Sequence, residues 1–148
     1  MKHVPLLVVL LAVVSLAACS SAPYAKKTQD RLQAYTAAAG APVNNFGFYP
    51  PIYSWEPLSN TQLVVYTKPK QAYFIDLAAC VNLQVTTGIG LTSNSNQVAV
   101  GFDKVIPFDT HTPCTIAKIR PIDMVHLKAV QQAQRKIEQR PRPEPSQQ

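Results

Sequence analysis

Apolar stretches separated by turn residues predict a β-rich region in the middle of the chain. Residues 62–67 and 72–77 are rich in β-branched and aromatic residues, and Lys-Pro-Lys-Gln between them favours a turn. The two stretches therefore predict an antiparallel hairpin. Apolar and polar residues alternate over 81–86, which predicts a strand with one solvent-facing side, although residues 80–83 also fit a helical turn.

A second alternating stretch predicts another strand. Apolar residues occupy every second position over 98–102, and residues 105–108 extend or close the strand. Pro107 indicates a sheet edge, because proline cannot donate to a central ladder. Between the predicted strands, residues 88–92 (Gly-Ile-Gly-Leu-Thr) resemble a phosphate loop only superficially, because the lysine and the third glycine are missing. We expect a bend between strands there.

In the last predicted strand, residues 114–120, the apolar residues do not all fall on the same face. Cys114 and Ile116 fall on one face, whereas Ile119 falls on the other. A bulge near residues 117–118 would insert one extra residue and return Ile119 to the core.

Helical patterns flank the strands. Residues 28–39 predict a short helix that ends before Gly40, and Asp123 is a candidate N-cap for a helix over 124–139. We therefore predict a mainly β (α+β) fold, a small curled antiparallel sheet or partly open barrel of about five or six strands with a short N-terminal and a C-terminal helix. The alternative is a flat α+β sheet with both helices on one face. The second helix carries a thin apolar stripe, formed by Leu127, Val130, Ala133 and Ile137.

The first residues predict export. An apolar run over residues 4–14 follows Lys2, and it is shorter than the roughly 20 residues that span a bilayer. It has the length and flanks of a signal peptide. Leu16-Ala17-Ala18-Cys19 resembles the lipobox of bacterial lipoproteins. This resemblance implies a diacylglycerol on the Cys19 sulfur, cleavage before Cys19 and acylation (palmitate) of the new amino terminus. By similarity with lipoprotein sorting, Ser20 implies the outer membrane, facing the periplasm.

These features divide the chain of 148 residues into successive parts. Removing the signal peptide leaves 130 residues, which suits a single domain. A proline-rich end cannot build a core and is expected to be disordered. The predicted parts are the signal peptide (1–18), a lipidated tether (19–27), one β-rich domain (28–123), a helix (124–139) and a disordered tail (140–148).

The predicted export determines which partners the charge suits and which chemistry the cysteines are expected to show. The net charge of +6 would suit nucleic acid, but export argues against that partner. The expected partners are the membrane, through the lipid anchor, and an envelope protein or anionic polymer, with simple solubility as the plainer explanation of the charge. If Cys19 is lipidated, Cys80 and Cys114 remain in an oxidising compartment, and we predict a disulfide between them.

An aromatic segment is the candidate binding surface. If the segment is a binding site, its rings form a stacking platform for sugar rings or for a proline-rich partner. The structural alternative is that the rings cover one open end of a small β core. The segment's aromatic residues are Phe46, Phe48, Tyr49, Tyr53 and Trp55.

Catalytic constellations are sparse. His111 and His126 are the only histidines after the predicted signal, and neither is spaced from a nucleophilic side chain in a way that indicates a catalytic site. A zinc site using His111 and Cys114 would compete with the disulfide. Asp76 and Asp103 are scattered at strand ends and turns. We therefore expect no enzyme, cofactor or metal, but a non-catalytic, lipid-anchored envelope module. Alternatives are an inhibitor or sensor that inserts loop 109–113 into a target, and a cryptic hydrolase.

The chain also resembles a family of small, uncharacterised proteobacterial lipoproteins that is classed as a domain of unknown function. The resemblance covers about residues 31–123. It implies that the two later cysteines recur as a pair, and it supplies no activity and no catalytic residue. The residues that carry it are Tyr35, Ala39-Gly40, Pro42-Val43, Phe46, Trp55, Leu58, Tyr73, Ile75, Leu77, Cys80, Leu83, Ile89, Leu91-Thr92-Ser93, Val98, Phe102-Asp103, Val105, Cys114, Ile116, Ile119-Arg120-Pro121 and Asp123.

Overall fold

The computed structural model describes residues 22–139, and the chain divides into two compact units after Asp30. Helix α2 (Ala22–Ala38) crosses this division. In the first unit, its described part carries an ion pair between Lys26 Nζ and Asp30 Oδ2 at 2.9 Å. The second unit contains the rest of α2, every strand of the described chain and helix α3 (Met124–Glu138).

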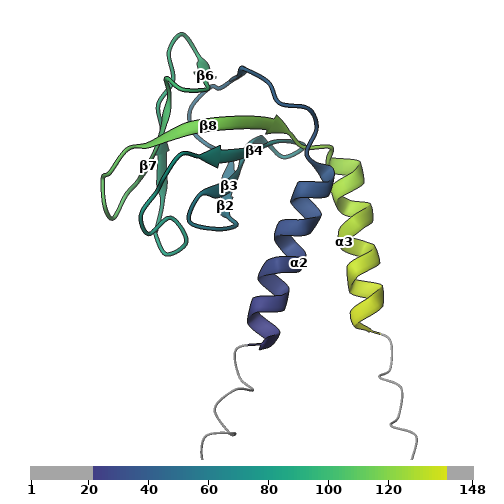
Figure 1. Cartoon of the computed structure of the whole chain (residues 1–148). Coiled ribbons are helices and arrows are strands. Elements are labelled where there is room, and N and C mark those ends of the chain that lie inside the picture. Colours follow the sequence, from purple (N-terminus) through teal and green to yellow (C-terminus); the bar gives the residue numbers. More distant parts are fainter. Residues whose placement is uncertain (1–21, 140–148) are drawn as a thin grey trace, which may run out of the picture. The chain divides into compact units, whose positions relative to one another are not determined.

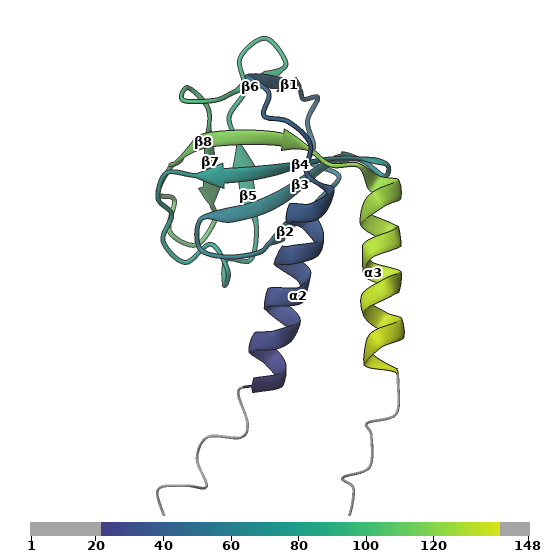
Figure 2. The same ribbon diagram turned by 45° about the vertical axis from the view of Figure 1, so that its right-hand side comes forward.

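A curled antiparallel sheet of six strands forms the body of the second unit, in the order β2-β3-β4-β8-β7-β5 (Figure 1). The edge strands β2 and β5 are not paired with each other, so the sheet is a half-barrel with one open side (Figure 2). Strands β1 and β6 form a separate pair. The predicted fold class is confirmed. The strands are β1 (Asn45–Gly47), β2 (Ser54–Pro57), β3 (Gln62–Lys68), β4 (Gln71–Leu77), β5 (Ile89–Leu91), β6 (Gln97–Ala99), β7 (Lys104–Pro107) and β8 (Cys114–Pro121).

The predicted hairpin is confirmed as β3 and β4, which are apolar on both faces. Leu63 pairs with Ile75 and faces the interior of the half-barrel, which is filled by the larger hydrophobic cluster. Val64 pairs with Phe74 on the opposite face, where a second cluster includes Tyr35 of α2. Because both faces are covered, these strands are continuous apolar runs and do not alternate.

The predicted bulge in β8 is also confirmed. Asp76 pairs with Lys118, but the next residue of β4, Leu77, pairs with Ile116, so Ala117 is the extra residue. The insertion places both Ile116 and Ile119 in the core.

The strand predicted over 81–86 is wrong. Residues after Cys80 form turns, with Asn82 at φ 59° and its carbonyl accepting from Val85 N–H and Thr86 N–H at 3.1 Å each. Leu83 is buried, whereas Val85 is exposed. The alternation arose from one buried anchor residue in a loop, and the helical-turn alternative is nearer to the observed structure.

Three further expectations in this region need correction. Residues 88–92 do not form a bend, because Ile89–Leu91 are strand β5. Pro107 does not mark an edge, because β7 lies between β8 and β5 and proline is its last residue. The strand predicted over 98–102 ends at Ala99, and Phe102 lies in a turn with 83% of its surface exposed.

The helices begin and end close to the predicted positions, with one exception. Helix α2 begins at Ala22, before the predicted start at Thr28. The proline at position 23 falls in its first turn, where proline is tolerated. The predicted N-cap of α3 is confirmed: the Asp123 side chain accepts from Val125 N–H and His126 N–H.

Only the first half of the predicted apolar stripe on α3 packs against the domain. Leu127 is buried and Val130 is partly buried against the second cluster, but Ile137 is 63% exposed. Within residues 22–139, no helix is both long and apolar enough to cross a membrane.

Candidate functional site

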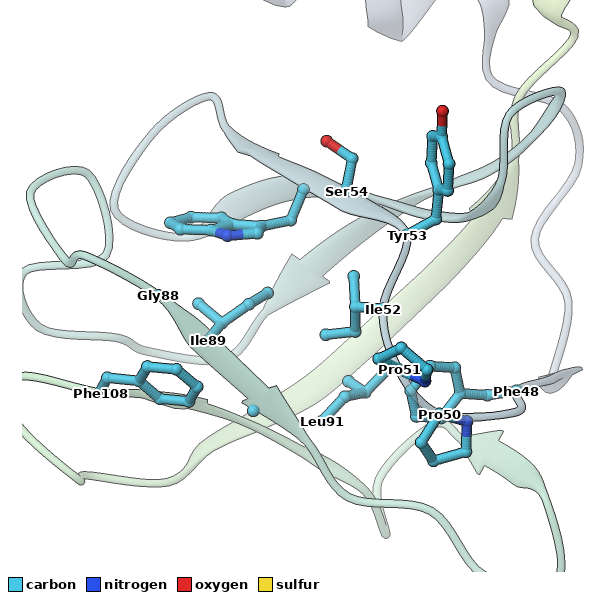
Figure 3. A pocket seen from close by; sticks show the side chains of 12 residues that line it. Phe48, Pro50, Pro51, Ile52, Tyr53, Ser54, Gly88, Ile89, Leu91 and Phe108 are labelled. Atoms are coloured by element: carbon cyan, nitrogen blue, oxygen red, sulfur yellow. The ribbon is translucent and has the colours of Figure 1, made fainter.

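A pocket lies at the open side of the half-barrel, where the two edge strands of the sheet face each other (Figure 3). Its volume is about 410 Å³. In Figure 3, Ile52 and Ile89 lie on facing sides of the space, with Phe108 beside Ile89. The lining residues are Phe48, Pro50, Pro51, Ile52, Tyr53, Ser54, Trp55, Gly88, Ile89, Gly90, Leu91 and Phe108.

One wall comes from β2 and the loop before it. Trp55 pairs with Val65 of β3, which fixes the indole at the sheet edge. The loop is held at its start by Phe48 N–H, which donates to Asn96 O at 2.8 Å, and at its end by Tyr53 N–H, which donates to Tyr66 O at 3.0 Å. A proline-rich loop tied at both ends gives a wall whose shape does not depend on a ligand.

The other wall comes from β5 and from Phe108, which follows β7. Phe108 N–H donates to Gly88 O at 2.9 Å. The Phe108 ring lies against Gly88 so closely that a Cβ at position 88 would be 2.5 Å from Phe108 Cδ2. Gly88 is therefore required for this ring position, in which Phe108 remains 54% exposed.

The pocket is chemically apolar. None of its lining side chains carries a charge. The Tyr53 ring and the Ser54 hydroxyl point away from the space in Figure 3. Trp55 also lines the pocket, and its indole N–H has no acceptor among the described residues. Such a lining suits binding through rings and methyl groups.

A carboxylate, that of Asp109, directly follows the pocket residue Phe108 in the chain. Asp109 accepts hydrogen bonds from Thr87 N–H at 2.7 Å and from the Thr87 hydroxyl at 3.1 Å. Hydrogen bonding to Thr86 and Thr87 holds the pKa of Asp109 below its usual range. The exposed carboxylate is therefore ionised at neutral pH, next in the chain to the Phe108 ring.

The predicted aromatic surface is divided by the structure. Phe46 is buried and stacks on Tyr73, with ring centroids 4.1 Å apart, so it belongs to the core. Tyr49 is 72% exposed and does not line the pocket. Phe48, Tyr53 and Trp55 do line it. The interpretation as a cover of the core therefore holds for Phe46, whereas Phe48, Tyr53 and Trp55 border a space and stay candidates for a binding surface.

Sequence reasoning missed the second wall. Residues of β5 and Phe108 were assigned to a bend and to the end of a strand, with no link to the aromatic segment. The available signal was the pair of glycines that flank Ile89, since a glycine in a strand often marks a close approach.

The predicted disulfide between Cys80 and Cys114 is present, with a Cα–Cα distance of 5.2 Å. It ties the loop after β4 to the first residue of β8. Cys19, the predicted lipidation site, lies outside the described residues.

A second polar cluster lies between α2 and the sheet, away from the pocket. The Tyr35 hydroxyl donates to Glu56 Oε2 and is 2.8 Å from the Tyr66 hydroxyl, while Arg31 Nη1 is 3.1 Å from Glu56 Oε1. Burial and the hydrogen bond to Glu56 raise the pKa of Tyr35 above its usual range, and burial also raises the pKa of Tyr66. The cluster is internally hydrogen-bonded and joins the helix to β2 and β3.

The carboxylates considered in the sequence do not line the pocket. Asp76 accepts from Gln62 at 2.8 Å and pairs with Arg120 at 3.1 Å. Asp103 is buried and accepts from the Thr92 hydroxyl and Ala99 N–H, each at 2.7 Å. In the part of the chain that the structure describes, no group of His, Cys, Asp and Glu residues is placed to hold a metal.

Comparisons with known proteins give the family without an activity. No curated protein and no solved structure matched the chain. The sequence model of one family, described as "Family of unknown function (DUF6491)", matches residues 1–138, further in both directions than the predicted 31–123. The chain belongs to this family of unknown function.

Proposed function

We propose that this protein is a lipid-anchored binding module of the cell envelope and that the pocket at the open side of the half-barrel is its binding site. The pocket is the observation that carries the proposal. It brings together residues from both edge strands, which are far apart in the sequence, around a space that no side chain of the described chain fills.

The lining favours binding over catalysis. Its rings, prolines and aliphatic side chains bury a ligand's apolar surface, and the Trp55 indole N–H gives one directed hydrogen bond. Asp76 and Asp103, the carboxylates considered for a hydrolase, do not line the pocket and are bonded to Arg120 and to Thr92 respectively. A non-catalytic module is therefore better supported than a cryptic hydrolase.

The anchor belongs to the proposal. The lipobox resemblance supports a lipid on Cys19, and Ser20 supports the outer membrane, facing the periplasm. Two or more acyl chains hold a protein stably on a bilayer. The Cys80–Cys114 disulfide suits an oxidising compartment, which supports this location.

In-cell photo-crosslinking tests the proposal. A photoreactive phenylalanine analogue is placed at Phe108, which lines the pocket, and in a matched control at Phe102, which is exposed and lies outside it. We expect a specific adduct from position 108 that is absent from position 102 and reduced in a Cys19→Ala background. The same yield from both positions, or none from position 108, would contradict the pocket as a binding site.

A further inference from the structure

We propose that the occupant of the pocket is the proline-rich segment 140–148 of a neighbouring copy of the same chain, bound as a polyproline-II helix. This inference rests on the proposed function, because it names the partner of the same pocket. The segment reads Arg-Pro-Arg-Pro-Glu-Pro-Ser-Gln-Gln and directly follows the last described residue, Gln139.

The lining selects a proline-rich ligand over a sugar. A sugar presents many hydroxyl groups, each of which needs a polar partner in a buried site. The pocket offers no charged or amide side chain, and the hydroxyls of Tyr53 and Ser54 point away from it. A polyproline-II segment presents pyrrolidine rings that pack on aromatic walls, and its prolines have no N–H that would need an acceptor in the pocket. The Trp55 indole N–H, which has no acceptor among the described residues, can donate to one of its carbonyl groups.

Charge complementarity favours this particular segment. An acidic group is next in the chain to the pocket residues: Asp109 follows Phe108 and accepts from Thr87, the residue before Gly88. Arginines alternate with prolines at positions 140 and 142. A segment seated with its prolines on the apolar walls can therefore place a guanidinium against the Asp109 carboxylate.

The length of the segment favours a neighbouring copy over the same molecule. Leu127 is the buried residue of α3, and Gln139 lies 12 residues further on, about 18 Å at 1.5 Å per residue. Nine residues of polyproline II span about 28 Å. Returning along α3 to its own domain would use most of that length before any contact with the pocket. Copies anchored on one membrane surface have a high local concentration, which supports binding between molecules.

A peptide titration tests the affinity and its chemistry. The full chain, purified in detergent, is titrated with a synthetic peptide of residues 139–148, and the Trp55 indole signal is followed. We expect saturable binding, weakened at least about 10-fold when the three prolines are replaced by alanine. Asp109→Asn should weaken it by about 2- to 5-fold at low salt and leave it unchanged at high salt. Absence of saturable binding, or equal binding of the alanine peptide, would overturn the inference.

Mapping the adducts of the photoreactive residue at position 108 identifies the occupant in cells. We expect the adduct to join two chains, with the second attached within residues 140–148, and to vanish when that segment is deleted. An adduct to a different protein would leave the pocket as a binding site but overturn this occupant. An adduct within a single chain would also overturn it, whereas the absence of any adduct would count against the proposed function itself.

Discussion

The ring of Phe108 lies directly against Gly88, so that a Cβ added at Gly88 would be 2.5 Å from one ring carbon and 2.7 Å from the next. Real Cβ atoms do not approach other atoms so closely, and the ring must move if the glycine is replaced. Both residues line the pocket. This contact therefore sets the shape of one wall, and it provides a way to change that wall without touching the opposite one.

Gly88→Ala should displace the Phe108 ring, and because this ring is 54% exposed and can turn towards solvent, the free energy of unfolding should fall by no more than about 1 kcal/mol. The loss of ligand binding should exceed that expected from the change in stability, since the folded variant keeps a distorted wall. Denaturant unfolding and crosslinking yield from position 108 measure the two effects. Gly47→Ala is the matched control, because a Cβ there meets no atom within 4 Å, and it should change stability by less than about 0.5 kcal/mol. Equal behaviour of the two variants would contradict this role of Gly88.

Loss of the Cys80–Cys114 disulfide should destabilise the domain. The bridge spans 34 positions, and closing a loop of that length is worth about 3.5–4 kcal/mol in the chain-entropy model. Denaturant unfolding of a Cys80→Ser, Cys114→Ser double variant measures the loss. Addition of a reductant should destabilise the wild type by a similar amount and leave the double variant unchanged; sensitivity of the variant to reductant would show that another bond is involved.

Tyr35→Phe should weaken the join between α2 and the sheet by about 1–3 kcal/mol, because Glu56 and Tyr66 each lose a hydrogen-bond partner. Burial raises the pKa of Tyr35, so the folded state holds this proton more tightly than the unfolded state does. Its contribution is complete below the unfolded pKa of about 10 and is lost as the pH rises above that value, at up to about 1.4 kcal/mol per pH unit.

The decrease of the free energy of unfolding at alkaline pH distinguishes the contribution of Tyr35 from that of the other tyrosines. Urea unfolding between pH 8 and about 11.5 should show a shallower decline for Tyr35→Phe than for the wild type. Tyr49→Phe, which changes an exposed tyrosine, serves as the control and should keep the wild-type slope. A slope that is unchanged in Tyr35→Phe would mean that the proton of Tyr35 is not held by the fold.

Helix α3 should fray at low pH. The backbone N–H groups of His126 and Val125 donate to Asp123 and lower the pKa of its carboxyl group. A lowered folded-state pKa stabilises the helix above the unfolded pKa of about 3.9, and the stabilisation is lost as the pH falls through the folded-state value. The protection of the amides of residues 124–130, that is, their exchange rate relative to the intrinsic rate at the same pH, should therefore fall below about pH 4, and Asp123→Ala should show the lower protection already at neutral pH. Undiminished protection in the alanine variant would exclude the cap as the cause.

The elements that depend on local chemistry could be predicted from the sequence. The β3–β4 hairpin follows from its turn, the Asp123 cap from its position before a helical pattern, and the bulge at Ala117 from the broken parity of one strand. In each case the information lies within a few residues. The Cys80–Cys114 pair could be predicted because the assignment of Cys19 left one combination.

The pocket could not be predicted because it depends on how the sheet curls. Its walls come from residues 48–55 and from residues 88–91 with Phe108, and only the strand order brings them together. Periodicity was misleading where one residue determined the burial: Leu83 anchors a loop, although its neighbours gave the pattern of a strand. Pro107 was assigned to an edge because its position at the end of β7 was not visible in the sequence.

The most direct test of the pocket as a binding site is the indole N–H resonance of Trp55, because the chain has a single tryptophan and it lines the pocket. The spectrum of the labelled full chain, purified in detergent, is recorded with and without an excess of the peptide of residues 139–148. The account predicts that the resonance shifts in the wild type and in Gly47→Ala, and stays in place in Gly88→Ala. An unmoved resonance in the wild type, or the same shift in Gly88→Ala, would contradict it.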